Sequence, residues 1–229
     1  AVKLFFLLER LELKIENFED TLKKYTQTFC KVDLHYRRFV TFADKSGLTD
    51  LFGELEKKVE QFYVNRFLTR LNEQWQEKIE KHKWESESFD NQQTFFEKRV
   101  RPILQKNNKV FVVISDALRY ECAVELKEMI LREDRFQAEL EAMLGVLPSY
   151  TQLGMAALLP NKKLDMDNKA EKVLVDGQSS LGLDGRRKIL QKTIGKKATA
   201  MHLKDFMKLN QEKGRILTRD HEVIYLYHD

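Results

Sequence analysis

Two short segments of the chain place oxygen atoms where chemistry could occur, and the first contains Asp116. This residue follows an apolar run, residues 110–114, whose β-branched side chains predict a buried and parallel strand. Ligands of α/β proteins bind at the carboxyl edge of the sheet, so a carboxylate there is a candidate ligand for a divalent metal. Asp116 is equally suited to capping the next helix, and the residue alone leaves both interpretations open.

The second segment, residues 147–160, delivers a hydroxyl group to the start of a predicted helix. Pro148, Ser149 and Tyr150 predict a rigid turn, and Thr151 then opens a helix of small and apolar residues. Backbone N–H groups and the helix dipole favour an anion such as phosphate at that position. A Thr hydroxyl is a weak nucleophile until a metal or a base activates it. Without such a neighbour Thr151 is an N-cap, which is the interpretation that the residue alone favours.

The composition limits the classes of protein to which the chain can belong. Its 229 residues are 42% hydrophobic and 33% charged, which is typical of one fair-sized globular domain or two small ones. The net charge of +4 is too slight to indicate nucleic acid or an anionic membrane. Cys30 and Cys122 are too few for a disulfide framework and favour a reducing, cytoplasmic setting. No apolar run approaches the roughly 20 residues of a membrane helix, so we expect no membrane association.

Residues 1–106 have helical periodicity and predict a helical region. We expect a helix near residues 5–29, a long helix that begins near Ser46, Gly47, Thr49 and Asp50, and a shorter helix near residues 92–104 that Pro102 distorts or closes. The long helix carries one apolar stripe, formed by Leu51, Leu55, Val59, Phe62, Phe67, Leu71, Trp75 and Ile79.

Residues 107–229 alternate between short apolar runs and helical patterns. After the first strand we expect a helix at residues 118–131, an extended segment at 137–147, the helix at Thr151, strands at 173–175 and 198–200, helices at 185–191 and 202–210, and a last strand at 223–227. This alternation predicts an α/β layer fold with its site at the carboxyl edge of the sheet. The chain opens and closes inside predicted elements, so we expect a piece of a longer protein.

The two segments together resemble a known family. The sequences VFVVISDALRY at residues 110–120 and LPSYTQLGMAALLP at residues 147–160, with Val175-Asp176-Gly177 and Tyr225-Leu226-Tyr227-His228, are similar to the PglZ domain of the alkaline phosphatase superfamily. The likeness is closest to the PglZ phosphatase-like proteins of bacterial BREX phage-defence systems and covers residues 92–229. It implies an α/β fold class, with a helical N-terminal region, 1–106, followed by a truncated alkaline phosphatase-like core, 107–229.

The resemblance also implies roles for particular residues. Asp116 maps to a metal ligand at the end of the first central strand, and Thr151 to a residue that is both metal ligand and nucleophile. Two zinc ions would activate the Thr151 hydroxyl, and a phospho-threonine intermediate would then be hydrolysed. His228 and Asp229 lie where a later ligand segment should begin, and His228 is a candidate metal ligand. Because superfamily members draw further ligands from later sequence, we expect this piece to bind zinc weakly and to turn over poorly.

Two further groups of basic residues are candidates for binding. Arg119 could bind the phosphate of a substrate from the Asp116 loop, although an arginine in an ion pair is the simpler interpretation. The clusters Arg186-Arg187-Lys188 and Lys196-Lys197 could contact a DNA backbone, although such clusters usually form a solvated surface.

Two functional hypotheses follow. In the first, the parent protein is a zinc-dependent phosphohydrolase or phosphodiesterase of BREX defence that acts on a phosphate ester. In the second, the domain keeps the fold and is a non-catalytic scaffold that binds other BREX proteins or DNA.

Overall fold

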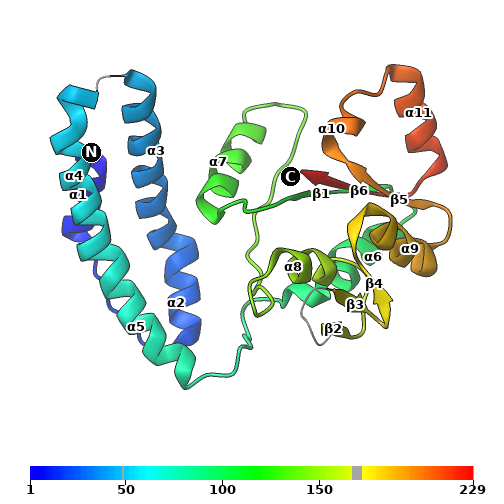
Figure 1. Cartoon of the computed structure of the whole chain (residues 1–229), viewed down its shortest axis with the longest axis horizontal. Helices are drawn as coiled ribbons and strands as arrows, with labels where there is room; N and C mark the ends of the chain where they lie inside the picture. The colour runs from blue at the N-terminus through cyan, green and yellow to red at the C-terminus, as the bar shows by residue number, and fades with distance from the viewer. Residues whose placement is uncertain (48, 167–171, 229) are drawn as a thin grey trace. The chain divides into compact units, whose positions relative to one another are not determined.

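The computed structural model describes residues 1–47, 49–166 and 172–228, without the side chains of residues 49–52. Asp229, named above beside His228, lies outside the described residues. The chain divides into two compact units, each described here by itself (Figure 1). A helical unit comprises Ala1–Ser88 with Arg119–Ala142, and an α/β unit comprises Phe89–Leu118 with Met143–Asp229. A domain boundary between residues 106 and 107 stays a prediction.

The helical unit confirms the helical character expected of the N-terminal region. Its elements are α1 (Val2–Arg10), α2 (Phe18–Lys24), the π-helical turn η1 (Tyr25–Phe29), α3 (Cys30–Ser46), α4 (Thr49–Tyr63), the π-helical turn η2 (Val64–Leu68), α5 (Thr69–Glu80) and α7 (Tyr120–Ile130). The expectation of one helix at residues 5–29 was wrong, because α1 ends at Arg10 and α2 begins at Phe18. Asn17 starts the second helix by accepting a 2.9 Å hydrogen bond from the Asp20 amide.

The long helix forms as predicted, but with a π-helical turn in its middle. One series of its core-facing side chains recurs every four residues and consists of Leu55, Val59, Tyr63, Phe67, Leu71 and Trp75, while Phe62 and Leu68 pack against the same core. In a regular α-helix a step of four residues turns the side chain about 40° past the previous one. The wider turn at Val64–Leu68 offsets part of this drift, so the stripe keeps facing the core.

A buried carboxylate holds three elements of the helical unit together. Asp33 on α3 is 4% exposed and accepts hydrogen bonds from the hydroxyls of Tyr25 at 2.7 Å and Tyr63 at 2.6 Å. The Arg119 guanidinium, just before α7, lies 3.6 Å from the same carboxylate. These contacts satisfy the buried charge, which would otherwise be costly to bury.

The α/β unit is built on a parallel sheet, which confirms the predicted fold class. Strands β1 (Val110–Ser115), β6 (Val223–His228) and β5 (Ala198–His202) lie in the order β1-β6-β5. Figure 1 shows helices on both sides of this sheet. The helical elements of this unit are η3 (Gln92–Thr94), η4 (Phe96–Val100), α6 (Arg101–Gln105), α8 (Thr151–Ala157), α9 (Gly182–Ile194), α10 (Leu203–Phe206) and α11 (Gln211–Asp220).

Three expectations for this unit need correction. Val173–Val175 is β3 of a separate antiparallel sheet, with β2 (Leu164–Met166) and β4 (Gln178–Ser179). The expected extended segment at 137–147 forms no ladder, only an isolated bridge between Asn91 and Leu144. β1 is parallel as predicted but is buried on one face only, since Phe111 is 42% and Val113 55% exposed.

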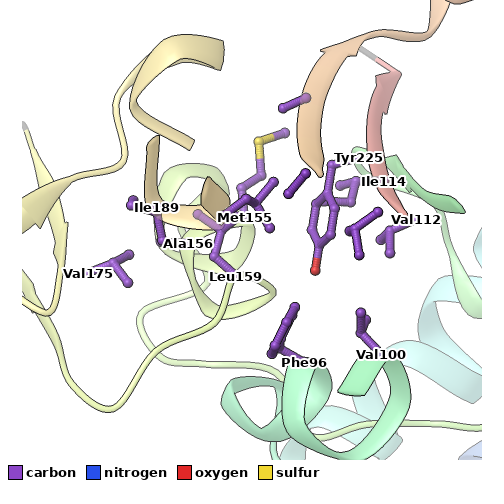
Figure 2. Close-up of a cluster of buried hydrophobic side chains, with 14 of the residues drawn as sticks. Phe96, Val100, Val112, Ile114, Met155, Ala156, Leu159, Val175, Ile189 and Tyr225 are labelled. Atoms are coloured by element: carbon purple, nitrogen blue, oxygen red, sulfur yellow. The ribbon is translucent and has the colours of Figure 1, made fainter. Parts of the chain in front are cut away.

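The core of the α/β unit lies between the parallel sheet and the elements η4, α8 and α9. Figure 2 shows Val112 and Ile114 of β1 and Tyr225 of β6 near Met155 and Ala156 of α8. Phe96 and Val100 extend the same core from the segment that precedes β1, and Ile189 extends it from α9. This packing fixes the carboxyl end of β1 and the start of α8 within one unit.

Candidate active site

A cavity of about 450 Å³ opens at the carboxyl end of β1. Its walls come from the end of that strand, the loop after it, the segment before α8 and the first turns of α8. Asp116 and Thr151 both line it, so the structure brings together the two residues on which the sequence analysis concentrated. Their meeting follows from the fold, because β1 and α8 pack on the same core.

Asp116 is exposed and lies just beyond the last residue of β1. Its amide donates to the His228 carbonyl at 3.2 Å, which extends the β1–β6 ladder by one hydrogen bond, and its Oδ1 accepts from the Ala117 amide at 3.0 Å. Ala117 has φ +53°, a left-handed conformation that costs a non-glycine residue about 1 kcal/mol. The helix-cap interpretation of Asp116 was wrong, because Arg119 occupies the N-cap position of α7.

Thr151 is the first residue of α8, and Tyr150 occupies the N-cap position without a side-chain capping bond. The N-cap interpretation of Thr151 was therefore also wrong. The threonine is exposed, and its helix has only seven residues, so we do not ascribe phosphate affinity to the helix terminus. What distinguishes Thr151 is that it shares a cavity with Asp116.

Gln92 is a cavity residue that sequence reasoning missed. Its Nε2 donates to the Gly154 carbonyl at 3.1 Å, and its Oε1 accepts from the Val146 amide at 3.2 Å. The side chain thus ties α8 to the segment before it, and both flank Thr151. A glutamine in a polar stretch gives no local signal of this role, because its partners are 54 and 62 positions away.

His228 ends β6 beside the cavity but does not line it in the described part of the chain. It pairs in register with Ser115, and its Nδ1 lies 3.0 Å from the serine Oγ. The imidazole ring is exposed and accessible to a ligand from solvent. The role of His228 as a metal ligand stays a prediction.

Arg119 belongs to the helical unit, whereas Asp116 and Thr151 belong to the α/β unit. Its Nε lies 2.8 Å from a carboxylate oxygen of Glu121, a fully buried residue, in addition to the Asp33 contact described above. Burial works to lower the pKa of Arg119, but Glu121 and Asp33 outweigh it, and the pKa is raised. The arginine is therefore ion-paired, and phosphate binding by Arg119 stays a prediction.

The basic cluster at residues 186–188 is less available than its sequence suggests. Arg186 is 6% exposed, so the expectation that it contacts DNA was wrong for this residue. Arg187 is bonded to Asp184 at 2.8 Å and to the Ala200 carbonyl at 2.9 Å. Lys197, in the second cluster, pairs with Glu222.

Two oxygen donors of the cavity are chemically suited to a divalent cation. Asp116 offers a carboxylate and Thr151 a hydroxyl to one cavity, and both are oxygen ligands that a divalent cation accepts. Among the described residues, no group of three or more His, Cys, Asp or Glu side chains could hold a metal ion. The donors present fit one edge of a metal site, and a two-zinc centre needs more ligands than these.

The sequence model of the BREX system PglZ alkaline phosphatase-like domain matches residues 95–229. The chain belongs to the PglZ family. Across 90% of the chain, 39% of its residues are identical to those of the alkaline phosphatase-like protein BrxZ of Escherichia coli O9:H4 (strain HS). The alkaline phosphatase-like protein PglZ of Bacillus cereus (strain H3081.97) is 37% identical across 92% of the chain.

The chain spans about a quarter of the length of these two relatives, since it covers 25% of each. The family match begins at residue 95, before η4, and takes in both Asp116 and Thr151. Apart from Gln92, the residues that line the cavity all lie inside the matched region. In the described ranges, no helix combines the length and the apolar composition that crossing a bilayer requires.

Proposed function

We propose that the whole protein is a metal-dependent phosphohydrolase or phosphodiesterase of the BREX antiviral defence system, with Thr151 as the nucleophile and Asp116 as a metal ligand. The observation that supports this most directly is the cavity that these two residues share. Membership of the PglZ family supports the same assignment, since the matched domain is alkaline phosphatase-like.

Zinc is the proposed cofactor, and bound zinc would lower the pKa of a ligating hydroxyl and neutralise charge on a phosphoryl group. The Thr151 oxygen would attack phosphorus and form a phospho-threonine ester while the bond from phosphorus to the leaving alcohol breaks, and the threonine proton would pass through solvent to the leaving oxygen. Water would then cleave the ester, release the phosphate product and return a proton to the Thr151 oxygen. Asp116 holds its carboxylate at the cavity wall through the Ala117 amide, and Gln92 ties down the two segments that flank Thr151.

The setting and partners belong to the same proposal. Other BREX proteins are the proposed partners, and a phosphate ester is the proposed substrate. The cytoplasm is the proposed location, with which the free thiols of Cys30 and Cys122, both among the described residues, are compatible.

The test is hydrolysis of a chromogenic phosphodiester by the full-length protein loaded with zinc. Thr151→Ala should lower kcat by about 10³-fold or more, because it removes the nucleophile, and Thr151→Ser should retain part of the activity. Thr218→Ala is the matched control, since Thr218 lies on α11 and bonds to the carbonyls of its own helix.

An inert, folded and zinc-loaded protein would overturn the proposal for this class of substrate, and so would a Thr151→Ala variant as active as the wild type. Either result would favour the scaffold alternative. Binding of DNA or of other BREX proteins would then be the next measurement.

A further inference from the structure

Arg186 is a buried cation in the α/β unit to which the proposed chemistry assigns no role. Arg186 is 6% exposed, and its Nη2 donates to the Gln152 side-chain oxygen at 3.0 Å. The guanidinium carbon lies 4.4 Å from the centroid of the Tyr227 ring. Neither contact is with a carboxylate, and its Nε has no hydrogen-bond partner among the described residues. Such a burial is costly, so a purely stabilising role does not account for it.

The two partners of Arg186 are the immediate neighbours of two residues of the candidate site. Gln152 follows Thr151 in the first turn of α8, and Tyr227 precedes His228 at the end of β6. One side chain therefore contacts the element that carries the proposed nucleophile and the strand that carries the candidate ligand. Of the described residues, those that line the cavity include neither Arg186 nor its two partners, so these contacts lie behind the cavity wall.

The backbone fixes the place from which Arg186 reaches these partners. A Cβ atom at Gly185 would lie 2.7 Å from the Ser179 carbonyl oxygen, so α9 approaches β4 more closely than any other residue type would allow. One turn further on, Ile189 is buried in the same core as Ala156 of α8 (Figure 2), and Leu190 belongs to that core as well. The start of α9 is thus held from two sides, and Arg186 projects from a rigid support.

We propose that Arg186 is a positioning residue, which holds the first turn of α8 and the end of β6 in place from behind the cavity. The inference depends on the proposed function of Thr151, because the orientation of α8 matters to catalysis only if Thr151 reacts. An oxygen displaced by about 1 Å loses reactivity steeply, since attack on phosphorus requires alignment with the leaving group.

The test compares Arg186→Leu with Arg186→Lys in the full-length, zinc-loaded protein. We expect Arg186→Leu to lower kcat by about 100-fold with little change in KM, because substrate contacts are kept while the nucleophile is misplaced. Arg186→Lys keeps a donor for Gln152 and should recover part of kcat. Arg219→Leu makes the same change at an exposed arginine of α11, which pairs with Asp220, and should leave kcat unchanged.

Stability separates positioning from a structural role. Among the described residues Arg186 contacts no carboxylate, and replacing such a buried charge with an apolar residue is often neutral or stabilising. The thermal midpoint of Arg186→Leu should therefore equal or exceed that of the wild type. A fall in kcat that merely follows a loss of folded protein would overturn the inference. If Arg186→Leu does not fold, Gln152→Ala removes the same hydrogen bond from the other side and decides the question by the same kcat measurement.

A measurement that does not depend on catalysis distinguishes the positioning role of Arg186 from the proposed function of Thr151. Met155 lies on α8, lines the cavity and is 6% exposed. The NMR resonance of its isotope-labelled methyl group therefore reports the packing of α8. The resonance should shift in Arg186→Leu and Gln152→Ala but not in Arg219→Leu. An unchanged resonance and kcat in Arg186→Leu, beside an inactive Thr151→Ala, would overturn the positioning role and leave the proposed function intact. A shifted resonance in a protein that never hydrolyses phosphodiesters would instead count against the proposed function alone.

Discussion

Ser115 and His228 face each other across the paired ends of β1 and β6, with 3.0 Å between the serine Oγ and the histidine Nδ1. A hydrogen bond at Nδ1 fixes the orientation of the imidazole and leaves Nε2 as the nitrogen able to bind a metal. Ser115 directly precedes Asp116, and the His228 carbonyl accepts a hydrogen bond from the Asp116 amide. The contact between Ser115 and His228 therefore orders the edge of the candidate site.

His228→Ala should weaken zinc binding by about 100-fold if the imidazole is a ligand, and Ser115→Ala by about 10-fold, because the ring loses its orienting partner. Competition with a chromogenic chelator measures both affinities. His221→Ala is the control, since His221 follows α11, before β6 begins, and its Nδ1 is 2.9 Å from the Leu217 carbonyl. Wild-type affinity in His228→Ala would remove His228 from the ligand set.

Asp116→Asn should abolish most zinc binding at the cavity and lower kcat by about 10³-fold without unfolding the protein. The amide oxygen of Asn can still accept the 3.0 Å bond from Ala117, so only the charge is lost. Calorimetric titration measures the affinity for zinc, and the thermal midpoint shows whether the variant stays folded. Asp220→Asn, which removes an exposed carboxylate paired with Arg219, is the control. Equal zinc affinity in the two variants would contradict the ligand role.

Tyr63→Phe should destabilise the helical unit by about 1–3 kcal/mol, because the buried carboxylate of Asp33 loses a hydrogen bond of 2.6 Å. Urea unfolding, followed by far-ultraviolet circular dichroism, measures the change in the free energy of unfolding. Tyr36→Phe is a close control, since its ring stacks on Tyr63 at 3.8 Å and the stack survives the substitution. Equal stability of the two variants would show that the Asp33 contact contributes nothing.

The free energy of unfolding of the helical unit should fall as the pH rises above about 10. Burial, and then the hydrogen bond to Asp33 and the charge of that residue, raise the pKa of Tyr63 above its usual value of 10.0. The unfolded chain then releases the proton first, so stability is fully present below pH 10 and declines above it by up to about 1.4 kcal/mol per pH unit. Urea unfolding between pH 8 and pH 11 measures the slope, and Tyr63→Phe should reduce it. An identical slope in the variant would refute this assignment.

Gly185→Ala should destabilise the α/β unit by about 1–3 kcal/mol, since the new methyl group would meet the Ser179 carbonyl oxygen at 2.7 Å. Gly214→Ala should instead stabilise the unit, because the new methyl group would meet no atom within 4 Å beyond its chain neighbours and the backbone of α11, and alanine favours a helix over glycine by about 1 kcal/mol. Thermal unfolding of both variants measures the difference. The prediction fails if both substitutions shift the midpoint in the same direction.

Local sequence patterns determined much of what carries the candidate site. The strand Val110–Ser115 follows from a continuous apolar run that is rich in β-branched residues, and the start of α8 at Thr151 follows from the Pro-Ser-Tyr turn before a run of helix-forming residues. Short-range preferences decide such features, so they can be read from one sequence. The same reasoning misjudged residues 5–29, because it followed the apolar pattern past the capping signal of Asn17.

Only the tertiary structure decided which side chains meet. The cavity joins Asp116 to Thr151, Gln92 ties two distant segments together, and Arg186 turns inward to Gln152 although its neighbours in the sequence are basic. Arg119 is likewise engaged by Asp33, which lies far from it in the sequence. These partners are brought together by the packing of whole elements, and the energy of that packing is spread over the core. For this reason the pattern around any one of these residues carries no signal of its partner.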